Sequence, residues 1–133
     1  MNAVLLDTHS WAWSLTDRAS LSMHANRAIE QAEAVFVSPI TFYEIGQKVR
    51  LGKWPEMHPF VSELPSLLLE QGAREASLGI DICARAASIE WDHRDPFDRI
   101  LAATSIHLQL PLVSADVVFD QLSQQKGWLP RIW

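Results

Sequence analysis

Residues 33–52, EAVFVSPITFYEIGQKVRLG, join a buried strand to a helix and decide the class of fold. The segment over 33–37 leads through the apolar residues AVFV at 34–37, which is typical of a strand covered on both faces of a sheet. Ser38 followed by Pro39 is an N-cap with proline at the first helical position. Gly52 is a helix stop, so the sequence predicts a helix over 38–51 directly after the strand.

The same order of elements precedes this stretch. Residues 3–6 are apolar and end abruptly at Asp7, as a second buried strand would. Between the strands, residues 20–32 place apolar side chains three and four positions apart, which predicts a helix with one apolar stripe. The first part of the chain is therefore expected to form a strand, a helix and a second, neighbouring strand.

The rest of the chain continues the alternation, with turn residues separating the segments. We expect, in order, a helix over 59–71, a weak strand over 74–77, a helix over 79–89, a polar turn over 92–94, a helix over 97–108, a strand over 111–114 and an edge strand within 128–133. This pattern predicts an α/β fold with a mostly parallel sheet covered on both faces. Ligands in such folds gather at the carboxyl ends of the strands.

Length and composition fit one domain over residues 1–133, because 133 residues with 48% hydrophobic content can build one packed core. The chain has no run of about 20 apolar residues and no signal-peptide pattern, so we expect a soluble, cytoplasmic protein without a membrane partner. Cys83 is the only cysteine, which excludes an intrachain disulfide, and its helical surroundings predict a buried thiol. The net charge of -5 argues against broad electrostatic attraction to nucleic acid, unless clustered acids bind cations.

Two candidate acids lie in the first half of the chain, Asp7 at a predicted strand end and Glu44 in the second turn of a predicted helix. Asp7 follows a buried strand, so it is either the cap of a helix that starts after Thr8 or a ligand facing a cleft. Glu44 is either a surface acid paired with Lys48 one helical turn later, or an inward-facing acid at the edge of the apolar stripe. Each residue alone leaves both interpretations open.

Three further acids lie in the second half. Asp95 is expected to cap the helix that Pro96 begins, and Asp98 sits in the first turn, where acids favour the helix dipole. Asp116 follows the fourth strand in a loop, where aspartate commonly makes turns. Taken together, Asp7, Glu44, Asp98 and Asp116 would repel one another at one sheet edge without a cation. Their oxygen-only chemistry suits Mg²⁺ or Mn²⁺.

Four motifs carry a family resemblance: LLDTHSWAW at 5–13, SPITFYEIGQKVRLGK at 38–53, HRDPFDRILAATS at 93–105 and LVSAD at 112–116. With these motifs in this order, nearly the whole chain resembles the PIN-domain family, specifically the VapC-type toxins of bacterial toxin-antitoxin pairs. The resemblance departs at Glu90-Trp91-Asp92, where relatives often have a proline-containing turn, and at Ser105.

The resemblance implies a three-layer α/β/α sandwich, a metal-dependent endoribonuclease activity, a homodimer and a partner antitoxin. It places the family's acids on Asp7, Glu44, Asp98 and Asp116, with Asp95 as an outer acid. The implied chemistry is in-line attack of water on an RNA phosphodiester, with Mg²⁺ or Mn²⁺ as cofactor. We expect Asp7 and Asp98 to be the primary ligands; the number of ions stays open.

Polar residues beside these acids have two interpretations each. Thr8 and Ser114 either hold the carboxylates or satisfy local backbone groups. His9 and His93 lie near the acids, but the chain has no HExxH or clustered Cys/His spacing, which favours structural roles over zinc binding or general-base catalysis.

A basic and aromatic group completes the candidates. Lys48, Arg50 and Lys53 either contact phosphate or compensate the dipole at a helix end. Trp11 and Trp13 either stack on unpaired bases or pack in the core or against a partner.

Rival functions for such a chain differ in their motifs. A phosphoacceptor signalling domain requires paired acids after the first strand, and a haloacid-dehalogenase-type phosphatase requires a second acid where His9 stands. Neither pattern is present. A non-catalytic acidic-pocket binding or signalling domain of similar α/β fold stays open, because a ligand set does not by itself establish turnover.

Overall fold

Four short parallel strands form the centre of the molecule in the computed structural model, which describes residues 2–133. The sheet has the order β3-β2-β1-β4. Its strands are β1 (Ala3–Leu6), β2 (Ala34–Val37), β3 (Arg74–Glu75) and β4 (Leu112–Val113). The pair β1 and β2 is in register from Ala3 opposite Ala34 to Leu6 opposite Val37. The strand over 3–6 and the parallel sheet are thus confirmed.

Alternate residues of β1 divide the core into two layers, because successive side chains of a strand point to opposite faces. Ala3 and Leu5 pack with residues of α5 (Ile80–Ser88), α6 (Pro96–Leu108) and the 3₁₀ turn η3 (Val117–Leu122). Val4 and Leu6 pack against the other set of helices. That set consists of α1 (Thr8–Thr16), α2 (Met23–Gln31), α3 (Pro39–Arg50) and α4 (Leu64–Glu70).

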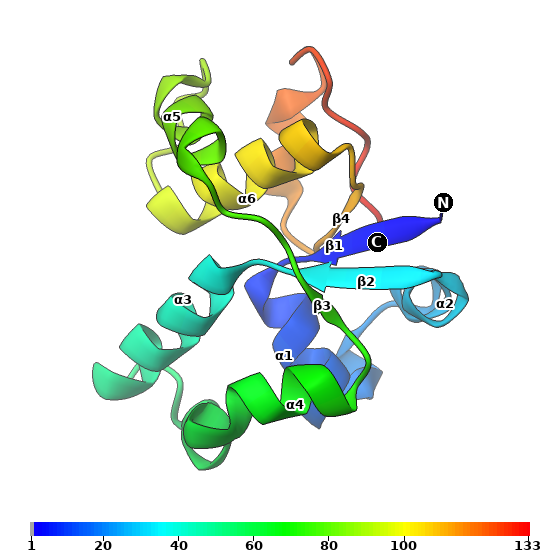
Figure 1. The fold of residues 1–133 in the computed structure, drawn as a ribbon, viewed down its shortest axis with the longest axis vertical. Helices are drawn as coiled ribbons and strands as arrows, with labels where there is room; N and C mark the ends of the chain where they lie inside the picture. The colour runs from blue at the N-terminus through cyan, green and yellow to red at the C-terminus, as the bar shows by residue number, and fades with distance from the viewer. Residues whose placement is uncertain (1) are drawn as a thin grey trace.

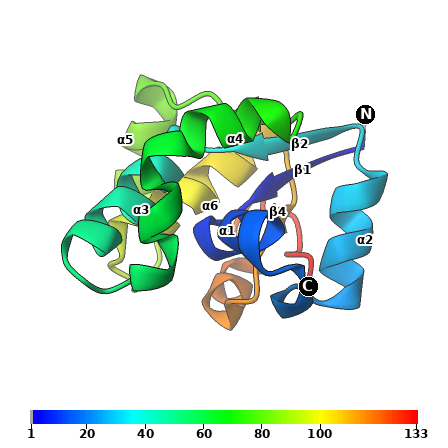
Figure 2. The same ribbon diagram turned by 90° about the horizontal axis from the view of Figure 1, so that it is seen from below.

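The helices therefore form two outer layers around the sheet, and the predicted three-layer α/β/α sandwich is confirmed. Figure 1 shows α5 and α6 above the strands and α1 and α4 below them. Seen from below in Figure 2, α1 lies in front of β1, and α2 stands beside the amino ends of β1 and β2. No helix within residues 2–133 is long and apolar enough to cross a membrane.

Some predicted elements differ in extent from those observed. The expected helix over 59–71 is divided into the 3₁₀ segment η2 (Pro55–Glu63) and α4, because Pro59 and Pro65 each remove a backbone donor. The expected edge strand within 128–133 is reduced to one bridge between Val113 and Ile132. A further 3₁₀ turn, η1 (Arg18–Ser20), precedes α2.

The expectation that Cys83 is buried is wrong, because its thiol is exposed. Ile82 and Ala86, four positions apart on α5, face the core, and Cys83 follows Ile82 by one residue and so points away from it.

Candidate metal centre

Asp7 connects the carboxyl end of β1 to α1. Its Oδ1 accepts a hydrogen bond from the backbone N–H of Ser10 at 2.8 Å, so it is the N-cap of α1. It is also buried, with 8% of its surface exposed, and it lines a pocket. Burial raises the pKa of this carboxyl, and hydrogen bonds from Ser114 and Ser10 oppose the rise. Asp7 therefore caps α1 and also faces a cleft, and its role as a metal ligand stays a prediction.

Glu44 lies in the second turn of α3 and is 5% exposed. Its Oε1 accepts a hydrogen bond from the Thr8 hydroxyl at 2.5 Å, and its Oε2 lies 2.7 Å from the Lys48 Nζ. The pairing with Lys48 is thus present, but it occurs inside the pocket and not on an open helix surface. Thr8 itself holds the carboxylate, which confirms the first of its two interpretations.

Asp98 lies in the first turn of α6, behind the cap that Asp95 provides. The Asp95 Oδ1 accepts the backbone N–H of Asp98 at 3.0 Å, which confirms the predicted cap. The Asp98 Oδ2 lies 2.7 Å from the His93 Nε2. Burial raises the pKa of Asp98 to about 6, although the hydrogen bond with His93 acts in the opposite direction. The charges of Asp95 and Glu44 also raise this pKa, because like charges disfavour ionisation.

The loop that carries His93 is held by the residue after Asp98. The Arg99 guanidinium donates hydrogen bonds of 2.6–3.0 Å to four backbone carbonyls. These belong to Ala86, Ile89, Trp91 and His93. Arg99 therefore fixes the position from which His93 reaches Asp98. The sequence reasoning missed the contact of His93 with an acid, since no spacing rule links a turn residue to it.

Asp116 reaches the pocket from the end of β4. Its Oδ1 accepts the backbone N–H of Val118 at 2.9 Å and caps η3, a turn that the sequence did not predict. Its own N–H donates to the Ser114 hydroxyl at 3.0 Å. Ser114 thus supports Asp116 locally and also acts on the carboxyl of Asp7. Asp116 is more exposed than the other three acids.

The four predicted acids line one pocket of about 590 Å³ at the carboxyl ends of β1 and β4. In Figure 1 this is the region where α1, α3 and α6 approach the ends of the strands. Its other lining residues are Thr8, His9, Trp13, Lys48, His93, Asp95, Leu101 and Ala115. The structure therefore brings together the four acids that the sequence proposed for one site. Of the two predicted tryptophans only Trp13 lines it, because Trp11 is fully buried in the core.

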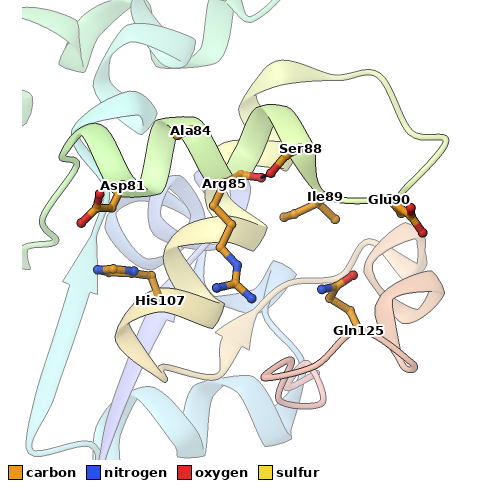
Figure 3. A pocket seen from close by; sticks show the side chains of 8 residues that line it. All are labelled: Asp81, Ala84, Arg85, Ser88, Ile89, Glu90, His107 and Gln125. Carbon is orange, nitrogen blue, oxygen red and sulfur yellow. Dashed lines mark hydrogen bonds between the residues drawn. The ribbon is translucent and has the colours of Figure 1, made fainter.

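A second pocket of similar size has a different character. It measures about 560 Å³ and lies between α5, α6 and the segment after η3. Figure 3 shows Arg85 extending from α5 between His107 and Gln125, with Asp81 and Glu90 at opposite ends of the hollow. Since its two acids are far apart and none of the predicted site residues lines it, this pocket is not a second acid cluster.

The acid pocket fits a divalent cation by its chemistry, although it is not preformed. Among residues 2–133, no three His, Cys, Asp or Glu side chains are close enough to make a ready metal site. Glu44 is instead paired with Lys48, and Asp98 is hydrogen-bonded to His93. A buried hydroxyl without a hydrogen-bond partner in the described part of the chain, the Ser10 Oγ, stands one helical turn from Asp7. Carboxylate oxygens are ligands that Mg²⁺ and Mn²⁺ prefer, and the hydroxyl of Ser10 can donate a hydrogen bond to a neighbouring carboxylate.

A three-layer sandwich with an acid pocket at the strand ends defines the class to which this chain belongs. The chain is a member of the PIN-domain family, whose pattern matches residues 4–124. It is 30% identical over 117 residues to Ribonuclease VapC22 of Mycobacterium tuberculosis, a match covering 87% of this chain and 88% of that protein. The resemblance predicted from the four motifs is therefore confirmed.

Solved structures share the fold. A toxin-antitoxin complex from Klebsiella pneumoniae contains a chain that superposes with a TM-score of 0.57 at 18% identity, covering 95% of both chains. VapBC2 from Rickettsia felis, bound to a DNA fragment from its promoter, matches with a TM-score of 0.66 at 12% identity, covering 97% of both chains. At these identities the likeness establishes the three-layer architecture alone.

Proposed function

We propose that this protein is a metal-dependent endoribonuclease that acts as the VapC-type toxin of a toxin-antitoxin pair. The observation that carries the proposal is the convergence of Asp7, Glu44, Asp98 and Asp116 on one pocket. Supporting it, the relative that shares 30% of its residues over most of the chain is named a ribonuclease. The proposal treats residues 1–133 as one catalytic domain that works in the cytoplasm.

The pocket residues have distinct roles in this proposal. Asp7 and Asp98 would hold the cation directly, and Glu44 and Asp116 would complete its coordination directly or through water. When bound, Mg²⁺ or Mn²⁺ supplies an activated water and stabilises charge on the phosphate oxygens. Thr8 orients the Glu44 carboxylate by its hydrogen bond of 2.5 Å, and His93 holds a proton between its Nε2 and the Asp98 Oδ2. No side-chain nucleophile is required.

The direct test is cleavage of mixed RNA by purified protein in Mn²⁺, in Mg²⁺ and in EDTA, after any co-purified inhibitor has been removed. We expect cleavage only with a divalent cation and a loss of at least about 100-fold in Asp7→Asn, because a metal ligand is removed. Asp81→Asn is the matched control, since Asp81 is exposed on α5 outside the acid pocket. Equal cleavage by Asp7→Asn and wild type would refute the proposal. Metal binding without cleavage would favour a non-catalytic acidic-pocket domain.

The proposed partners follow from the relatives. Because two of the matched structures are a toxin-antitoxin complex and a VapBC complex, we expect a cognate antitoxin to bind this chain and silence it. We also expect a homodimer. Co-expression with the product of the adjacent gene, followed by size-exclusion chromatography with light scattering, tests both expectations.

A further inference from the structure

Ile132 lies beside β4 at the edge of the sheet and pairs with it in parallel. Its backbone N–H donates to the Leu112 carbonyl at 2.9 Å, and its carbonyl accepts the backbone N–H of Ser114 at 3.1 Å. Figure 2 shows this part of the chain, in red, next to β4. The loop that leaves β4 toward the acid pocket is therefore held on its outer side by backbone hydrogen bonds.

Arg131 holds the same loop with its side chain. Its Nη1 donates to the Ser114 carbonyl at 2.9 Å, and its Nε and Nη2 donate to the two carboxylate oxygens of Asp120 at 2.9 and 3.1 Å. Ser114 and Asp120 lie on either side of Asp116 in the chain, at the end of β4 and within η3. Because the planar guanidinium presents its donors in one fixed geometry, Arg131 fixes the two ends of this loop relative to each other.

Ser114 connects this arrangement to the acids. It is fully buried, and its hydroxyl accepts the backbone N–H of Asp116 at 3.0 Å and hydrogen-bonds the Asp7 carboxyl. Its backbone N–H and carbonyl are bound by Ile132 and Arg131. A displacement of Arg131 would therefore move the one side chain that contacts two of the four acids.

We infer that Arg131 is a positioning residue of the acid pocket, which holds Ser114 and η3 so that the carboxylates of Asp7 and Asp116 face the same cation. The inference rests on the proposed function for its choice of a divalent cation as the ligand of these acids. Arg131 does not line the pocket, so it acts through Ser114 and Asp120 and not by contact with the cation. Groups that orient metal ligands from behind typically change metal affinity by roughly 10–100-fold when they are removed.

Mn²⁺ binding by the folded protein tests this role without RNA cleavage. Free Mn²⁺ is measured from its electron paramagnetic resonance signal, at a temperature where circular dichroism shows each variant to be folded. We expect Arg131→Met to bind Mn²⁺ about tenfold more weakly than wild type, because methionine keeps the apolar stem and removes the donors. Arg131→Lys should have an intermediate affinity, since one ammonium cannot pair with both Asp120 oxygens and also reach Ser114.

Arg18→Met is the matched control, because it also removes an arginine from an ion pair, that of Arg18 with Glu30 at 3.7 Å, outside the acid pocket. It should leave the Mn²⁺ affinity unchanged. RNA cleavage by Arg131→Met should approach the wild-type rate at saturating Mn²⁺ but require more Mn²⁺ for half of that rate. A purely structural role gives another result, a lower Tm in EDTA with the Mn²⁺ affinity of wild type, and would overturn the inference.

Hydrogen exchange of wild type, followed by mass spectrometry, keeps the inference testable if both Arg131 variants fail to fold. Coupling between two sites is reciprocal, so a cation bound by the acids must stabilise the segment that positions them. Mn²⁺ should therefore slow exchange in the peptide that contains Ile132 more than in peptides from α5, which carries none of the four acids. Equal slowing in both peptides would contradict the inference.

The outcomes separate the two proposals. Metal-dependent RNA cleavage, with the same Mn²⁺ affinity in wild type and Arg131→Met, would refute the positioning role alone. Mn²⁺ binding that depends on Arg131, without cleavage under any condition, would refute the nuclease and support the positioning role. A wild-type protein that binds no Mn²⁺ would refute both.

Discussion

Replacing Lys48 with methionine tests how much the ion pair in the acid pocket contributes to the stability of the fold. Methionine keeps most of the apolar stem of lysine and removes only the ammonium that lies 2.7 Å from the Glu44 Oε2. A pair of this spacing on an open helix contributes about 0.3–0.5 kcal/mol, and breaking a fully buried pair costs about 3–5 kcal/mol. The Lys48 side chain is 31% exposed and that of Glu44 7% exposed, which places this pair between the two cases.

We therefore expect Lys48→Met to lower the free energy of unfolding by about 1–2 kcal/mol in EDTA, or the Tm by about 3–8 °C. The response of the Tm to Mn²⁺ should also differ between Lys48→Met and wild type. Because the ammonium no longer competes for Glu44, the Tm rise on adding Mn²⁺ should be larger in Lys48→Met than in wild type.

Thermal unfolding followed by circular dichroism, with and without Mn²⁺, measures both effects. Lys126→Met is the control, since Lys126 is exposed and outside the acid pocket. If Lys48→Met and Lys126→Met unfold at the same temperature in EDTA, the ion pair does not stabilise the fold. If Mn²⁺ raises the Tm of Lys48→Met and wild type equally, Glu44 does not belong to the metal site.

Three further changes test other parts of the structure by urea unfolding in EDTA. Because the pKa of Asp98 is raised to about 6, the folded state holds a proton that the unfolded state releases; stability should fall as the pH rises from 4 to 7, and less so in Asp98→Asn. Arg99→Met should lose about 2–4 kcal/mol, and Arg99→Lys should not restore it, because four carbonyls depend on the guanidinium. Gly127→Ala should lose about 1–2 kcal/mol, since Gly127 has φ +86 and a Cβ there would lie 3.1 Å from the Ile106 side chain. Gly79→Ala meets open space, so its cost should be limited to the weaker N-cap that alanine gives α5.

Local signals in the sequence predicted most of the architecture. The helix after β2 begins after Ser38 and ends at Arg50, because the serine caps it and Gly52 takes the positive φ of a helix stop. The predicted strand over 74–77 shrinks to Arg74–Glu75, and the 3₁₀ segments were missed, because prolines and tertiary contacts decide such short elements. Propensity alone cannot distinguish a 3₁₀ turn from a loop.

The candidate site was predictable to the extent that it depends on topology. Strand ends of a parallel sheet meet at one edge, so Asp7 and Asp116 could be placed together before the structure was known. The side chains that contact these acids were harder to predict. His93 meets Asp98 only because Arg99 holds the intervening loop, and the stacking of His9 on Trp54 joins residues 45 positions apart in the sequence. Such contacts arise from long-range packing, which no spacing rule describes.

Asp7 has consequences for how this site can be dissected and how it can evolve. Since the same carboxylate oxygen that caps α1 belongs to the acid that lines the pocket, alanine at this position would remove a fold determinant together with the site residue. Asparagine keeps a capping oxygen and loses the charge, so Asp7→Asn tests the charge without removing the cap, whereas Asp7→Ala removes both. Under the proposed function, natural variants at this position face the same constraint: asparagine would keep the cap and lose the charged ligand, whereas residues that cannot cap α1 would also lower the stability of the fold.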